Sequence, residues 1–231
     1  MNRVHQHSCI ILKSQAFKET SLIHQVFSRD YGVLSLISKG SRRNNSKHGA
    51  LLQPFRPLLL SWSGKSDLKT LTGVDEQYRV APLFGLALYC GFYVNELLLN
   101  LLHKHDSHPT LFNEFEKVMV KLSKTEAIEP ALRQFEKVLL EEIGYGLALQ
   151  YDAVSGLAIQ PACQYIYRPE LGAVLTETNN DSESILGSTL LNLQNNQLSD
   201  KNELKQAKRL MRRLIDIQLD GKILKSRELF K

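Results

Sequence analysis

The sequence of 231 residues lacks the features that define several classes of protein. It has no run of 18 apolar residues, since even its richest segment, 83–102, is interrupted by Asn95, Glu96 and Asn100. This pattern excludes a membrane-spanning helix. The first nine residues carry His and Gln where a secretory signal needs an apolar core, so we expect a cytoplasmic protein.

Cysteine is scarce, and no catalytic motif is recognisable. The three cysteines, Cys9, Cys90 and Cys163, lie far apart without a C-x-x-C pair, which argues against a disulfide framework or a zinc ribbon. The segment 103–108 gathers three histidines and an aspartate, but it directly precedes Pro109, where polar residues commonly satisfy the end of a helix. We therefore expect no enzyme, no metal and no cofactor.

The charged residues are segregated along the chain. Residues 1–80 hold 12 basic and 5 acidic side chains, residues 81–200 hold 7 and 15, and residues 201–231 hold 10 and 4. Basic ends around an acidic middle indicate a polyanionic partner for the ends and a different role for the centre. Ordinary variation of surface charge is the alternative explanation.

Residues 1–80 are predicted to form a small β-barrel domain. Alternation of apolar and polar residues between Gly-containing turns predicts short strands. Five such strands favour an OB-fold, which commonly binds nucleic acid, over an SH3-like barrel. The predicted strands are Cys9–Lys13, Leu22–Ser28, Val33–Ser38, Arg56–Trp62 and Leu68–Thr72.

Residues 81–231 are predicted to form a mainly helical domain, which makes the chain an α+β protein. The helix after Pro82 is rich in leucine on nearly all sides, so we expect it to be central and buried. Region 151–180 is predicted to hold an irregular β-hairpin with strands Gln164–Arg168 and Gly172–Thr176. The other predicted helices are Pro109–Leu122, Glu129–Ile143, Ser182–Asn195 and Glu203–Leu219.

Two segments carry the chemistry expected of a nucleic-acid surface. The loop 39–47 places four cations, a glycine and amide donors between two strands, a composition that suits phosphate groups. The helix 203–219 separates an apolar face from a basic one, and more cations follow it. Four aromatic residues near the loop could stack on bases, although packing in the barrel core is the favoured role: Phe27, Tyr31, Phe55 and Trp62.

Several segments, in order and spacing, make the chain resemble the RecO family of bacterial recombination mediators and DNA repair proteins. The resemblance spans nearly the whole chain. The segments that carry it are Glu19–Leu22, Gly32–Arg42, Leu52–Leu58, Tyr93–Leu97, Pro130–Glu136, Gly144–Gly146 and Leu224–Leu229.

This resemblance implies an N-terminal OB-fold, a helical bundle and a C-terminal portion that packs back on the bundle. It also implies a non-catalytic, nucleoid-associated protein that binds single- and double-stranded DNA, anneals complementary strands, and helps RecR load RecA onto strands coated with single-stranded-DNA-binding protein. We predict that twelve basic residues bind the phosphates of DNA: Lys39, Arg42, Arg43, Lys47, Arg56, Lys69, Lys205, Lys208, Arg209, Arg212, Lys225 and Arg227.

The resemblance also bears on two further sites. Many members carry a C-x-x-C…C-x-x-C zinc site after the bundle, but here Asp152 and Ser155 stand at the first pair of positions, so we expect no zinc. Arg133 matches the arginine that receives the acidic, Phe-ended C-terminal tail of single-stranded-DNA-binding protein. A surface helix pair of Arg133 with Glu136 or Glu129 is the alternative.

A second function from another class stays open. The acidic middle of the chain would also suit a protein-assembly adaptor that binds nucleic acid only incidentally.

Overall fold

The computed structural model describes residues 3–43, 46, 48–177 and 183–230. They form two compact units, which are treated separately below. The first unit contains residues 1–126 and 224–231, and the second contains residues 127–223. Within the described ranges, none of the helices combines the length and hydrophobicity needed to cross a membrane.

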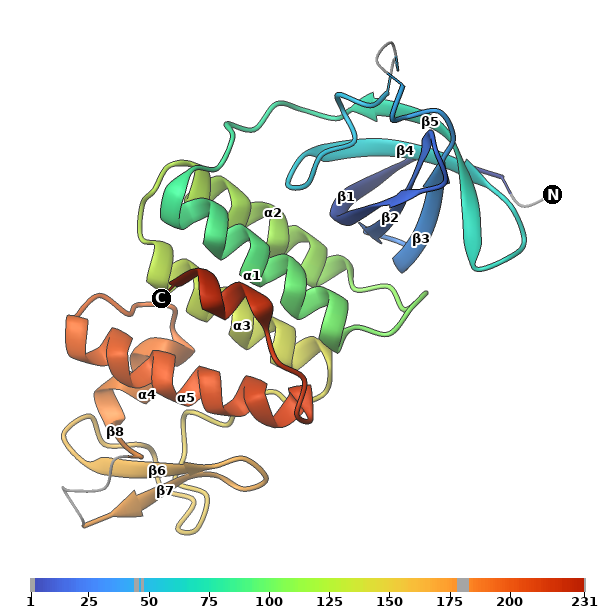
Figure 1. Cartoon of the computed structure of the whole chain (residues 1–231). Helices are drawn as coiled ribbons and strands as arrows, with labels where there is room; N and C mark the ends of the chain where they lie inside the picture. The colour runs from blue at the N-terminus through green and yellow to red at the C-terminus, as the bar shows by residue number, and fades with distance from the viewer. Residues whose placement is uncertain (1–2, 44–45, 47, 178–182, 231) are drawn as a thin grey trace. The chain divides into compact units, whose positions relative to one another are not determined.

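The first unit begins with five strands that pair in a closed ring (Figure 1). The pairs are antiparallel except for the parallel pair of the third and fifth strands. This OB-like arrangement encloses an apolar core that includes Leu34, Leu58 and Trp62. The strands are β1 (Arg3–Phe17), β2 (Ser21–Ser28), β3 (Gly32–Ser38), β4 (Pro57–Ser63) and β5 (Leu68–Glu76).

The part of the first unit that the structure describes also holds two α-helices and a short 3-10 helix: α1 (Gly85–Leu101), α2 (Pro109–Ser123) and η1 (Lys225–Phe230). The buried Asn95 of α1 donates to the carbonyl of Leu12 in β1 at 2.9 Å, and the rings of Phe27 and Phe112 lie 5.4 Å apart. These contacts join the helices to the barrel.

In the described residues of the second unit, three helices pack with a three-stranded sheet. Its elements are α3 (Ile128–Glu142), β6 (Gln164–Arg168), β7 (Gly172–Thr176), β8 (Ser184–Leu186), α4 (Gly187–Gln194) and α5 (Lys201–Leu219). Strand β6 lies between β7 and β8. The core is formed by apolar side chains from every part of the unit, among them Leu140, Tyr165, Ile185 and Met211.

The predicted elements are found, but several differ in their bounds or type. Strand β1 begins at Arg3, six residues before the predicted Cys9, and extends to Phe17. Residues Ser184–Leu186, which fall in the predicted helix Ser182–Asn195, form β8, because Ile185 pairs with Tyr165 of β6. Helix α1 is only partly buried, since its Leu86 is 56% exposed. The 3-10 helix η1 was not predicted.

The predicted division at residue 80 stays a prediction. It separates the chain by type of secondary structure, whereas the compact units place α1 and α2 with the barrel.

Candidate nucleic-acid interface

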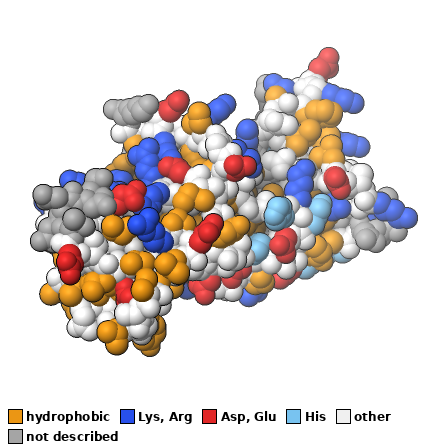
Figure 2. Space-filling model, turned by 90° about the horizontal axis from the view of Figure 1, so that it is seen from below, with side chains coloured by type: hydrophobic (Ala, Val, Ile, Leu, Met, Phe, Trp, Pro, Cys, Tyr) orange, Lys and Arg blue, Asp and Glu red, His pale blue; other side chains and the backbone are white. Residues whose placement is uncertain are grey.

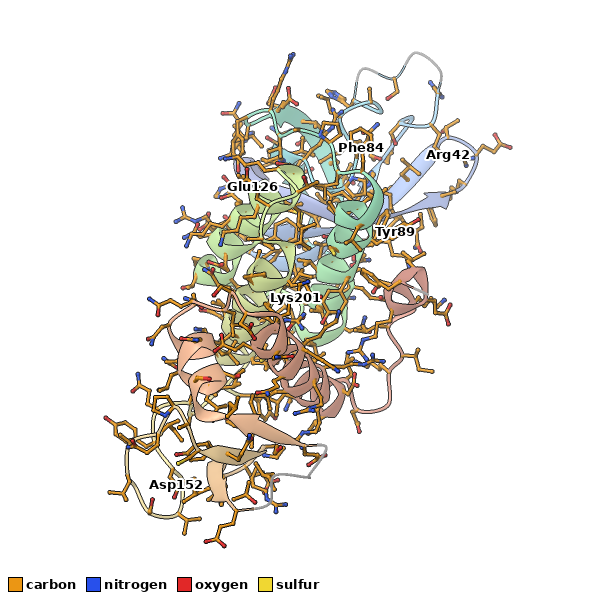
Figure 3. The ribbon with its side chains drawn as sticks, turned by 90° about the vertical axis from the view of Figure 1, so that its left-hand side faces the viewer. Arg42, Phe84, Tyr89, Glu126, Asp152 and Lys201 are labelled. Atoms are coloured by element: carbon orange, nitrogen blue, oxygen red, sulfur yellow. The ribbon has the colours of Figure 1, made fainter. Side chains whose placement is uncertain are left out.

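The basic loop after β3 is anchored to the turn between β1 and β2. The main-chain N–H of Arg42 donates to the carbonyl of Thr20 at 3.0 Å, and its Nη1 donates to the carbonyl of Lys18 at 3.1 Å. Gly40 has a φ of +72°, which favours glycine, and this lets the chain turn directly after Lys39. Figure 3 marks Arg42 at this end of the barrel.

Three cations line one recess of about 390 Å³ beside this loop: Lys18, Lys39 and Arg43. The ring of Phe17 also lines it, and the Lys18 ammonium lies 5.5 Å from the centroid of that ring. Both Lys39 and Arg43 are exposed. The recess therefore combines positive charge with an aromatic face, the two features that single-strand binding surfaces use.

A buried chain of hydrogen bonds supports the base of the loop. His24 Nδ1 lies 2.7 Å from Ser14 Oγ, its Nε2 lies 2.8 Å from Ser38 Oγ, and Ser38 Oγ lies 2.5 Å from Ser41 Oγ. Burial lowers the pKa of His24 to about 4, so the imidazole is neutral at neutral pH. An uncharged, fully bonded histidine at this point fixes the loop without adding a buried charge.

The other predicted DNA-contacting residues of the barrel lie in less open positions. Arg56 is half-buried, and its Nη1 lies 3.5 Å from the carbonyl of Ala50. Lys69 is half-buried, and its Nζ donates to the carbonyl of Ser66 at 3.2 Å. Lys47 lies outside the described residues.

The basic side chains of α5 reach the surface, but several have internal partners. Lys208 pairs with Glu129 at 2.9 Å, Arg212 lies 4.0 Å from Asp216, and Arg209 donates to the carbonyl of Ser184. Lys205 is exposed. Figure 2 shows one face of the molecule, on which some Lys and Arg side chains lie beside Asp and Glu side chains. The α5 face is therefore less purely cationic than its sequence predicts.

The C-terminal cations Lys225 and Arg227 belong to η1, which is held on α1 by one carboxylate. Glu96 accepts from the main-chain N–H groups of Lys225 and Ser226 at 2.9 and 2.8 Å, and from the Ser226 hydroxyl at 2.5 Å. The Lys225 side chain is exposed, whereas Arg227 is half-buried. Lys225 is thus the more accessible of the two.

Arg133 lies in α3 and is paired with Glu136 at 2.5 Å. The two side chains are 8% and 1% exposed, and Arg133 Nε is buried without a hydrogen-bond partner. The structure therefore contains the pair that was considered as the alternative, although inside the protein rather than on its surface. Any external carboxylate would have to compete with Glu136 for the guanidinium.

The region expected to lack zinc is held together by a carboxylate. Asp152 Oδ1 accepts from the N–H groups of Val154 and Ser155 at 3.2 and 2.6 Å and from the Ser155 hydroxyl at 2.7 Å, while Oδ2 accepts from the N–H of Leu175 at 2.7 Å. These bonds, those from Ser155 first, lower the pKa of Asp152 to about 2. Figure 3 marks this loop residue, which joins residues 152–155 to β7.

These residues do not fit a structural zinc site. The oxygens of Asp152 already accept from N–H and O–H groups, and Cys163 supplies the unit's single thiol. Over the described ranges, no group of three or more His, Cys, Asp or Glu side chains could hold a metal ion.

We predict that Asp152→Asn lowers the free energy of unfolding by about 2–3 kcal/mol, because an amide cannot replace a carboxylate that accepts four hydrogen bonds. Since folding lowers this pKa, the contribution is complete above pH 4 and is lost as the pH falls towards 2. Urea unfolding measures the loss, with exposed Asp75→Asn as the control. A chelator that destabilises the wild type would show that a metal supports the fold.

Sequence reasoning missed two residues of the recess and one of the α5 face. Phe17 and Lys18 directly precede the turn 19–20, and the β1–β2 register places Phe17 opposite Ser21, close to the basic loop. Arg213 also belongs to the basic residues of α5 but is not among the predicted DNA contacts. Its hydrogen bond to the carbonyl of Tyr167 depends on tertiary structure.

Comparison with known proteins places the chain in a family. The model for the recombination protein O N terminal region matches residues 1–76, and that for the C terminal region matches residues 85–228. A DNA repair protein RecO of Methylococcus capsulatus is 42% identical, with 100% of this chain and 94% of the relative covered. Another, of Thiobacillus denitrificans, is 42% identical, with 99% and 92% covered. The chain belongs to the RecO family of DNA repair proteins.

Proposed function

We propose that this protein acts in DNA repair and recombination by binding single- and double-stranded DNA through phosphate groups and by annealing complementary strands, without catalysing a reaction. One observation carries the proposal. Four cations, Lys18, Lys39, Arg42 and Arg43, surround one end of the barrel, and three of them line the same recess. Such a cluster attracts a polyanion whatever its sequence.

Cations that neutralise phosphates would also explain annealing. Two DNA strands repel each other through their backbones, so a protein surface that neutralises both backbones lowers this barrier. Contacts to phosphate carry no sequence information and leave the base edges able to pair. The exposed side chains of the basic loop are arranged for this kind of contact.

The partners follow from the family rather than from the geometry. We infer that the chain works with RecR and with single-stranded-DNA-binding protein, whose acidic tail it would bind through Arg133. Membership of the RecO family supports this inference, and the relatives are named as DNA repair proteins.

An annealing assay tests the proposal. Two complementary labelled strands are coated with single-stranded-DNA-binding protein and mixed with and without this protein. We expect the protein to accelerate duplex formation, and added salt to reduce the effect. Absence of acceleration on both coated and naked strands would contradict the annealing function and favour the adaptor alternative.

A further inference from the structure

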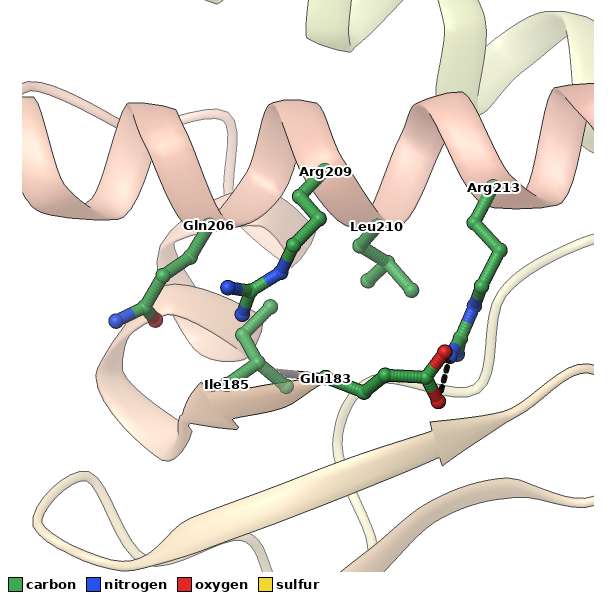
Figure 4. Close-up of a pocket in the computed structure, with 6 residues that line it drawn as sticks. All are labelled: Glu183, Ile185, Gln206, Arg209, Leu210 and Arg213. Carbon is green, nitrogen blue, oxygen red and sulfur yellow. Dashed lines mark ion pairs between the residues drawn. The ribbon is translucent and has the colours of Figure 1, made fainter. Parts of the chain in front are cut away.

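A cavity of about 200 Å³ lies between α5 and β8 in the second unit (Figure 4). Two arginines reach into it from α5, and apolar side chains lie between them. The residues that line it are Glu183, Ile185, Gln206, Arg209, Leu210 and Arg213.

Each of the two guanidinium groups donates a hydrogen bond to a main-chain carbonyl of the same unit. Arg209 Nη2 donates to the carbonyl of Ser184, and Arg213 Nη2 donates to the carbonyl of Tyr167. The two arginines are four residues apart on one helix, so their Cβ atoms lie about 5–6 Å from each other. A guanidinium has five N–H groups, of which one carbonyl uses only one. Each arginine is therefore oriented and still able to donate.

An anion already contacts one of these arginines. The carboxylate of Glu183 lies 2.5 Å from Nη1 of Arg213, and the dashed line in Figure 4 marks this pair. The Glu183 side chain is 51% exposed, whereas that of Arg213 is 28% exposed. Arg213 Nε is buried and has no hydrogen-bond partner. The arginine is thus placed to bind an oxyanion, and the carboxylate that it now binds lies where solvent reaches it.

We propose that this cavity binds a single phosphate group of the DNA backbone through Arg209 and Arg213, and that Glu183 is a built-in competitor that limits the affinity. The proposal rests on the DNA-binding function proposed above. Arginine suits phosphate because its N–H groups form paired hydrogen bonds to oxyanions. Lys205, which is exposed and lies four residues before Arg209 on the same helix, extends the positive charge beyond the cavity. A polyanion needs this extension and a single carboxylate does not.

Removing the competitor provides the sharpest test. We expect Glu183→Gln to tighten binding to a labelled single strand about two- to fivefold, the range for a surface ion pair. The slope of log affinity against log salt should become steeper by up to about 0.7, the value for one phosphate contact on a single strand. Exposed Glu170→Gln, which changes the net charge equally, lies on the β6–β7 turn and is the control. Equal behaviour of the two variants, with DNA bound by the wild type, would overturn the phosphate site.

The arginine variants complete the test. Arg213→Lys keeps the charge but loses the paired N–H geometry, so it should weaken binding and remove the gain from Glu183→Gln in the double variant. Thermal unfolding checks that the hydrogen bond to Tyr167 is not needed for folding. If Glu183→Gln tightens binding to an acidic peptide but not to DNA, the cavity is a carboxylate site and the proposal is wrong. If the wild type binds no DNA, the proposed function fails and the phosphate site with it.

Discussion

The double replacement Arg42→Ala, Arg43→Ala should weaken binding to DNA of every sequence. It should also make the slope of log affinity against log salt less negative by roughly one to two. Each arginine is exposed at the end of the barrel, where it can neutralise one phosphate and release its counterion. Sequence preference should not change, because phosphate contacts do not read bases. Fluorescence anisotropy of labelled strands at several salt concentrations measures both effects.

A matched variant separates this site from a loss of net charge. The control variant Lys65→Ala, Arg79→Ala removes two exposed cations from the same unit but from positions outside both the basic loop and the recess. It should leave the slope nearly unchanged. Circular dichroism shows whether the loop variant remains folded after the loss of the hydrogen bond from Arg42 to Lys18. If the folded Arg42/Arg43 variant has the same slope as the wild type, the main DNA-binding surface is not this loop, and α5 becomes the favoured site.

Arg133→Ala should lower the free energy of unfolding by about 3–5 kcal/mol. Glu136 is only 1% exposed, so the variant loses the ion pair between Arg133 and this buried carboxylate. Replacing both residues by apolar ones, Arg133→Met with Glu136→Met, should restore much of the loss because no unpaired charge remains. Chemical denaturation of the wild type, Arg133→Ala and the double variant measures the three free energies of unfolding. If Arg133→Ala is as stable as the wild type, the pair does not stabilise the fold.

The same double variant tests the predicted role of Arg133 in partner binding. It removes the guanidinium without leaving a buried charge, so a loss of binding cannot be attributed to an uncompensated Glu136. We expect the folded double variant to lose binding of an acidic, Phe-ended peptide and to retain binding of naked DNA. If the peptide still binds, its site lies elsewhere in the protein.

Local pattern was enough to predict most elements of the fold. In β3, for example, buried and half-buried residues alternate from Leu34 to Ser38, so the period of two is visible in the sequence. The start of β1, by contrast, is polar and partly exposed, and it was missed because no alternation marks Arg3–His7. Helix η1 was missed for another reason: its main-chain N–H groups are satisfied by Glu96, 129 residues earlier in the chain.

The candidate sites were predicted less completely than the fold. Composition identified the basic loop, because four cations and a glycine stand within nine residues. It could not show that Lys18 joins them from another hairpin, or that Glu183 pairs with Arg213. It also could not distinguish a surface pair from the buried pair of Arg133 and Glu136, because burial depends on the packing of the whole unit.

A salt titration of the wild-type protein with a labelled single strand tests the central claim most directly. If Lys18, Lys39, Arg42 and Arg43 each neutralise a phosphate, log affinity should fall linearly with log salt with a slope of about −3 or steeper, at about 0.7 per contact. A slope near zero, or no binding even at low salt, would contradict the claim that this protein acts by holding DNA backbones.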